Sequence, residues 1–92
     1  MHPAREVSVG DIVKYRLSDG DIAMIAAAMP DTSKRNQHMA GMVMPMVVVR
    51  VWSVDCVNGQ VFIDGYGTHW ATSRLRGDAD GNWDWSGHSE GE

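Results

Sequence analysis

The side chains best suited to chemistry gather in one short part of the chain, between positions 66 and 85. They combine flat aromatic rings, ring N–H groups and planar cations. Such groups can stack on and charge-pair with a flat anionic ligand, or they can anchor a protein partner. The candidate ligand-binding residues in this region are Tyr66, His69, Trp70, Arg74, Arg76, Trp83 and Trp85.

The spacing of three residues in this region favours a binding surface. Trp70, Thr72 and Arg74 should share one face of a strand, because alternate residues of a strand point to the same side. An arginine beside a ring can bind a phosphate and stack at the same time. The alternative is that Trp70 is a core residue and that Arg74 and Arg76 are solvated charges at the edge of a sheet. Both interpretations stay open at this point.

Arg50 is a further candidate, because it is a charged residue within the otherwise apolar positions 46–54. A charge in such a place reaches an edge of the sheet, pairs with a carboxylate such as Asp64, or lines a pocket. Since an unpaired buried charge is costly, the ion pair is the outcome that we favour.

Signatures of catalysis or of a metal site do not accompany these residues. The four histidines at positions 2, 38, 69 and 88 lack the spacing of zinc ligands, and Cys56 stands alone. Positions 78–84 begin like a calcium loop, but Trp83 stands where the loop needs glycine and the closing glutamate is missing, so a polar turn is predicted. There is no nucleophile elbow and no phosphate-binding glycine loop. We therefore expect a binding protein and not an enzyme, with no cofactor and no metal.

Length and charge narrow the class of partner. The 92 residues, 43% of them apolar, predict one domain with an ordered core at about 7–86 and a disordered acidic tail at 87–92. The net charge of −4 argues against nucleic acid as a partner, since nonspecific binding needs a basic field.

The longest apolar run, at 22–30, is too short to span a bilayer, and the first residues lack the apolar segment of a secretory signal. A lone cysteine suits a reducing cytosol.

Five short strands and one helix are expected to position the candidate residues. Apolar residues at helical spacing predict a helix at 21–29, capped by Asp19 or Asp21 and ended by Pro30. Asn58-Gly59 predicts a type I′ hairpin turn with Gly59 at positive φ. Alternation and β-branched runs predict strands at 12–17, 46–54, 60–63, 69–74 and 82–86.

These elements predict a mainly β fold, a small SH3-like β-barrel of about five strands with one short inserted helix. The alternative is an open α+β sheet with the helix on one face. The predicted helix is apolar on every side, and the methionines at positions 39, 42, 44 and 46 add more apolar surface. We therefore expect a homo-oligomer, a dimer or higher, although filling of the core by methionine stays open as the alternative.

Four segments in a fixed order extend over most of the chain: Val9-Gly10-Asp11-Ile12-Val13-Lys14-Tyr15, Val47-Val48-Val49-Arg50-Val51-Trp52, Trp70-Ala71-Thr72-Ser73 and Gly81-Asn82-Trp83-Asp84-Trp85. Together they resemble a set of small proteins of actinobacterial bacteriophages, whose pattern opens VGDxVHY and closes GTWHW. Lys14 and Asp84 stand where that pattern often has histidine. The resemblance implies a phage accessory protein that acts in the host cytoplasm.

Two hypotheses on function follow. By analogy of size and surface with compact phage proteins, the first is sequestration of a small anionic nucleotide-like ligand without catalysis, which would inhibit host defence signalling. The second is a protein–protein module, either a virion decoration subunit or a direct inhibitor of a host protein.

Overall fold

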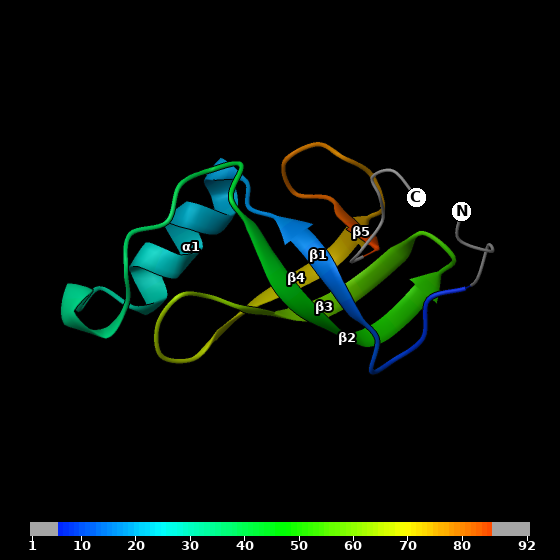
Figure 1. Cartoon of the computed structure of the whole chain (residues 1–92), viewed down its shortest axis with the longest axis horizontal. Helices are drawn as coiled ribbons and strands as arrows, with labels where there is room; N and C mark the ends of the chain where they lie inside the picture. The colour runs from blue at the N-terminus through cyan, green and yellow to red at the C-terminus, as the bar shows by residue number, and fades with distance from the viewer. Residues whose placement is uncertain (1–5, 86–92) are drawn as a thin grey trace.

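The computed structural model describes residues 6–85, and in this part of the chain five strands form one antiparallel sheet (Figure 1). The order of the strands across the sheet is β4-β3-β2-β1-β5. A mainly β fold of about five strands with one helix is thus confirmed. The elements are β1 (Ile12–Arg16), α1 (Asp19–Ala28), the short 3-10 helix η1 (Thr32–Lys34), β2 (Val43–Ser53), β3 (Cys56–Phe62), β4 (Thr68–Leu75) and β5 (Trp83–Trp85).

The sheet is not closed within residues 6–85. Its end strands, β4 and β5, are not neighbours in the sheet, and only an isolated bridge between Arg76 and Trp83 joins the chain after β4 to β5. A closed barrel is therefore not shown, and the arrangement agrees better with the open sheet that was the alternative. Figure 1 shows α1 at one end of the sheet.

The hydrophobic core lies on one face of the sheet. On β1, Val13 and Tyr15 are fully buried, whereas Ile12 and Lys14, which alternate with them, are exposed, as expected for a half-buried strand. We call the buried face the inner face and the other the outer face. α1 packs against the core through Ile25. The buried apolar residues from the five strands are Val13, Tyr15, Met46, Val48, Val57, Val61, Ala71 and Trp83.

α1 begins two residues earlier than predicted, because Ser18 and not an aspartate caps it. The Ser18 hydroxyl accepts a hydrogen bond from the Asp21 N–H at 3.1 Å, and the Asp21 carboxylate accepts one from the Ser18 N–H at 2.8 Å. This reciprocal pair is a capping box, which satisfies two backbone donors at the start of a helix. Asp21 thereby turns inward at the third position of the helix.

The predicted hairpin turn at Asn58-Gly59 is wrong. Both residues lie inside β3, the turn that joins β2 to β3 is at Val54-Asp55, and Gly59 does not have a positive φ. Gly59 is needed for a different reason: a Cβ there would lie 2.3 Å from Cγ of the buried Met46 on the neighbouring strand. The glycine therefore permits close packing in the core instead of a turn.

A bulge in β4 has the largest consequence for the candidate residues. The pairing of β3 with β4 passes from Gly59–Ala71 to Val57–Arg74, so that β4 contains one residue more than β3 in this interval. Ser73 has a φ of 53°, a left-handed conformation that is uncommon outside glycine. A bulge of this kind exchanges the two sides of a strand for the residues beyond it.

Candidate functional site

A buried carboxylate, that of Asp21, is the centre of a polar cluster between α1 and the inner face of the sheet. Its Oδ2 accepts hydrogen bonds from the Tyr15 hydroxyl at 2.6 Å and from the Ser18 hydroxyl at 2.8 Å. Its Oδ1 lies 2.7 Å from Nε2 of His69 and 3.5 Å from Nη2 of Arg74. The cluster ties α1 to β1 and β4, because its members come from all three elements.

The Asp21 carboxylate is kept ionised by its donors. Burial alone would raise the pKa of Asp21, but hydrogen bonds from His69, Tyr15 and Ser18 outweigh burial and hold the pKa well below its ordinary value. Burial, and next the Asp21 carboxylate, raise the pKa of the Tyr15 hydroxyl, which therefore stays protonated. The cluster therefore contains one fixed negative charge surrounded by hydrogen-bond donors. These hydrogen bonds stabilise the position of α1.

Two of the predicted binding residues, His69 and Arg74, belong to this cluster. His69 is buried, and the Arg74 guanidinium lies on the inner side with it. Trp70 lies on the outer face and is 57% exposed. The predicted shared face of Trp70, Thr72 and Arg74 is therefore wrong, because the bulge at Ser73 turns Arg74 to the opposite side.

Two further predicted residues, Trp83 and Trp85, belong to the core. Trp83 is fully buried, and its ring N–H donates to the carbonyl groups of Arg74 at 3.1 Å and Asp55 at 3.2 Å. The half-buried Trp85 meets it edge to face, with ring centroids 5.7 Å apart. These rings fill the interior, so neither is free to stack on a ligand without rearrangement of the core.

Arg50 lies on the exposed surface of β2. The predicted ion pair with Asp64 is not formed: the Asp64 carboxylate accepts a hydrogen bond from the Asn36 side chain at 2.9 Å. The Arg50 guanidinium instead lies 4.4 Å from the centre of the Trp52 ring. Arg50 escapes the cost of burial because its side chain reaches solvent over this ring.

The last two predicted residues, Tyr66 and Arg76, lie in loops. Tyr66 is 70% exposed, and the ammonium group of Lys34 lies 5.5 Å from the centre of its ring. Nε of Arg76 donates a hydrogen bond to Asp84 at 3.1 Å. The eight predicted residues thus lie in separate parts of the structure and do not form one site.

A groove of about 490 Å³ opens between α1 and the chain that follows it. We call it the α1 groove. Its volume lies within the range of sites for small molecules. Apolar residues of α1 line one side of it, and polar residues of the following chain line the other. Its lining consists of Ile22, Ile25 and Ala26 from α1, and Thr32, Arg35, Asn36, Gln37 and His38 from the following chain.

His38 gives the α1 groove a polar group with unused hydrogen-bonding capacity. The side chain is only 4% exposed, and Nε2 accepts a hydrogen bond from the Asp64 N–H at 2.9 Å. Nδ1 must then hold the proton of the neutral ring. Among the described residues this buried Nδ1 has no hydrogen-bond partner. A buried donor left unpaired costs about 1–3 kcal/mol, so the position is suited to a ligand that supplies an acceptor.

Positive charge borders the α1 groove. Arg35 is held at the end of the helix, where its Nε donates to the Met29 carbonyl at 2.8 Å. A second hollow of about 230 Å³ shares Thr32, Arg35 and Asn36 with the groove. The other residues of its lining are Ser33, Lys34, Asp64, Gly65 and Tyr66, so it contains two cationic residues and one carboxylate. Sequence reasoning missed this region, since none of the predicted ligand-binding residues lies within positions 31–45. The adjacent Lys34-Arg35 pair followed by His38 was the signal that could have indicated it.

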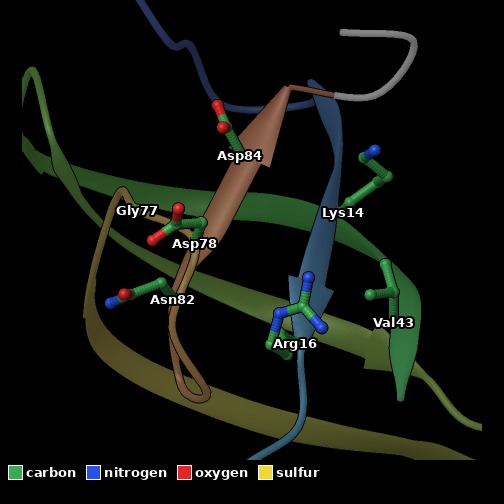
Figure 2. A pocket seen from close by; sticks show the side chains of 7 residues that line it. All are labelled: Lys14, Arg16, Val43, Gly77, Asp78, Asn82 and Asp84. Carbon is green, nitrogen blue, oxygen red and sulfur yellow. The ribbon is translucent and has the colours of Figure 1, made fainter. Parts of the chain in front are cut away.

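A third hollow, of about 180 Å³, lies beside β1 and β5, and Figure 2 shows the side chains around it. It contains groups of both charges, and its volume is below the range of small-molecule sites. Lys14 and Asp84, the two positions that depart from the phage pattern, are direct cross-strand partners here. The lining residues are Lys14, Arg16, Val43, Gly77, Asp78, Asn82 and Asp84.

Other classes of site are not found in the part of the chain that the structure describes. Within residues 6–85, no three His, Cys, Asp or Glu side chains are grouped so that they could hold a metal ion. In the same residues no helix has the length and apolar character needed to cross a membrane. Comparison with protein-family models, with curated proteins and with solved structures finds no match for this chain. Function must therefore be inferred from the residues of the chain itself.

Proposed function

We propose that the protein captures a small anionic nucleotide-like ligand in the α1 groove, without chemical change to the ligand. The observation that carries this proposal is that His38, a lining residue of this groove of about 490 Å³, has a buried Nδ1–H without a partner among the described residues. The ligand class is the one expected from the sequence, whereas the location is new.

Each part of such a ligand has a complementary surface in the groove. A flat ring would lie against Ile22 and Ala26, and a ring nitrogen or carbonyl oxygen would accept a hydrogen bond from the Nδ1–H of His38. A phosphate would meet Arg35 and Lys34, and charge-assisted hydrogen bonds of this kind are about twice as strong as neutral ones. Tyr66 borders the adjoining hollow, where its exposed ring could stack on a second base for about 1–3 kcal/mol.

The resemblance to phage proteins implies a biological role for the capture of such a ligand. A phage accessory protein that removes a signalling nucleotide from the host cytoplasm would inhibit a defence that depends on that nucleotide. The fold that presents the groove would be an SH3-like barrel left open between β4 and β5. The Arg76–Trp83 bridge, where the two ends of the sheet approach each other, supports this description.

A thermal-shift screen tests the proposal. The probes are cyclic dinucleotides, cyclic ADP-ribose isomers and AMP, with inorganic phosphate as the comparison. A probe at about 100 times its Kd stabilises by about 2.7 kcal/mol, which raises the Tm of a chain this short by more than about 10 °C. No shift with any nucleotide would contradict the proposed ligand class.

Two neighbouring alanines provide matched variants. Ala26 lines the groove and Ala27 does not, although both are exposed residues of α1. Ala26→Trp should fill the groove and abolish the shift, whereas Ala27→Trp should retain it. Equal Tm shifts in both variants would show that the ligand binds outside the α1 groove. Recovery of unchanged nucleotide from the heated complex is expected, and recovery of a hydrolysed product would overturn the assignment as a non-catalytic protein.

The protein–protein module remains a second candidate because of the outer face of the sheet. Ile12, Trp52, Phe62 and Trp70 are all large apolar side chains with about half or more of their surface exposed, and exposed apolar patches commonly mark interfaces. This function predicts that Phe62→Ser abolishes binding to virions or to a host protein while the Tm stays unchanged. Binding that survives this change would count against the outer face as the interface.

A further inference from the structure

β4 forms one end of the sheet, and no strand of the described part of the chain pairs with its outer edge. Within residues 6–85 its only neighbour in the sheet is β3. Proteins usually protect an exposed edge with a charge, a proline, a bulge or a very short strand. β5 at the other end is three residues long and includes Asp84. β4 has none of these devices over positions 68–72, where the histidine is turned inward to Asp21, and its bulge comes only at Ser73.

In the unprotected segment, Thr68-His69-Trp70-Ala71-Thr72, the outer-face residues are arranged symmetrically about Trp70. If two copies paired antiparallel with Trp70 at the centre, each Trp70 would lie opposite its counterpart, and Thr68 of one copy would lie opposite Thr72 of the other. Aromatic pairs and threonine pairs are among the favourable cross-strand pairs. On the inner face the large His69 would lie opposite the small Ala71.

We infer that β4 pairs with β4 of a second copy of this chain, antiparallel and centred on Trp70, so that the two sheets become one continuous sheet. The two outer faces then lie on the same side, and each 57% exposed Trp70 is covered by the other. Arginine side chains do not meet across the pair, because Arg74, the arginine of β4, is paired with Asp21 on the inner side. The bulge at Ser73 ends the pairing.

The symmetric order of residues is what selects a second copy as the partner. Any extended strand could satisfy the open backbone groups of an edge, but only an identical segment gives like-with-like pairs on the outer face and large-with-small pairs on the inner face. Dimerisation through β4 is independent of ligand capture, because His38, Arg35 and Ala26 lie on other elements. The homo-oligomer expected from the sequence would then be formed by an edge strand and not by the apolar helix.

Sedimentation velocity of the full chain over a range of concentrations tests the association. We expect a dimer, and we expect Trp70→Lys to be a monomer, because two like charges would lie directly opposite each other. Ile12→Lys is the matched control: Ile12 is 61% exposed, and the pairs Ile12–Val47, Val47–Gln60 and Gln60–Trp70 place it in the same row of the sheet, three strands away. A wild-type monomer at the highest soluble concentration, or a dimer that Trp70→Lys leaves intact, would overturn the inference.

Disulfide trapping tests the register. In a Cys56→Ser background, Trp70→Cys should cross-link two copies on mild oxidation, because residues directly opposite each other are about 4.5–5.5 Å apart between Cα atoms. Thr68→Cys alone and Thr72→Cys alone should not cross-link, since each lies about 14 Å from its own counterpart. The double variant Thr68→Cys/Thr72→Cys should cross-link again. Trapping by Thr68→Cys alone, or no trapping in any variant, would refute pairing centred on Trp70.

Discussion

Replacement of Asp21 is the sharpest test of how the fold is held together. Its carboxylate is fully buried and accepts hydrogen bonds from Tyr15, Ser18 and His69, with Arg74 at 3.5 Å. Asp21→Ala would leave the Tyr15 and His69 donors buried without an acceptor. At about 1–3 kcal/mol for each unpaired donor, and with the helix cap also lost, the free energy of unfolding should fall by about 3–5 kcal/mol.

A loss of that size is a large part of the total stability of a domain, which is about 5–15 kcal/mol. Asp21→Asn is therefore the better variant for measurement. It keeps the shape and one acceptor oxygen but removes the charge, and hydrogen bonds to a charged group are worth about 1.5–3 kcal/mol. We expect a loss of about 2–3 kcal/mol in urea unfolding followed by tryptophan fluorescence. Asp19→Asn is the control, since Asp19 is exposed in the same turn and acts mainly on the helix dipole, for about 0.3–1 kcal/mol.

The pH dependence gives this test a second readout. The folded-state pKa of Asp21 is lowered, so the stability that its charge supplies is fully present above its unfolded pKa of about 3.9 and is lost as the pH falls toward the folded pKa. The difference in stability between wild type and Asp21→Asn should be constant above about pH 5 and shrink below about pH 4. If Asp21→Asn costs no more than Asp19→Asn at neutral pH, or if the difference does not change in acid, the assignment of Asp21 as the central charge is refuted.

Three further variants test the local packing of the sheet by urea unfolding. Gly59→Ala should cost about 1–3 kcal/mol, because its Cβ would lie 2.3 Å from Cγ of Met46, and an unchanged stability would refute the close approach. Asn58→Ala should lower the free energy of unfolding by about 1–3 kcal/mol. The reason is that Oδ1 of Asn58 accepts hydrogen bonds from the Ser73 N–H at 2.6 Å and from the Trp52 ring N–H at 3.0 Å. A smaller loss of stability would show that water replaces the amide. Ser73→Gly should raise stability by about 0.5–1 kcal/mol, since its φ of 53° suits glycine, and a clear loss would contradict the bulge.

The sequence predicted the kind and order of the elements well, because hydrophobic periodicity is a direct consequence of a one-sided core. Alternation in β1 and the β-branched run of β2 were enough to place these strands to within a few residues.

The turn at Asn58-Gly59 could not be predicted correctly, because the dipeptide has two compatible uses. Turn propensity favours a hairpin, but the amide of Asn58 is needed by Ser73 fifteen positions later, and the missing Cβ of Gly59 is needed by Met46.

The candidate site was more difficult to predict than the fold, because it depends on which side of a strand each residue lies. One extra residue in β4 places Arg74 on the opposite face of the sheet from Trp70. Nothing in the alternation of the sequence indicates a bulge at Ser73. The aromatic cluster was likewise divided by burial, with Trp83 in the core and Trp70 on the surface. Proximity in sequence was therefore a poor guide to proximity on one surface.

The α1 groove depends on long-range contacts that local patterns do not encode. Arg35 is fixed by the carbonyl of Met29 at the end of α1, and His38 is fixed by the backbone of Asp64, 26 positions further on. These two contacts attach residues 35–38 to the end of α1 and to the chain that follows β3. Native proteins rarely leave a buried donor unpaired without a functional reason. Under the proposed function, a ligand would supply the acceptor that this histidine N–H lacks among the described residues.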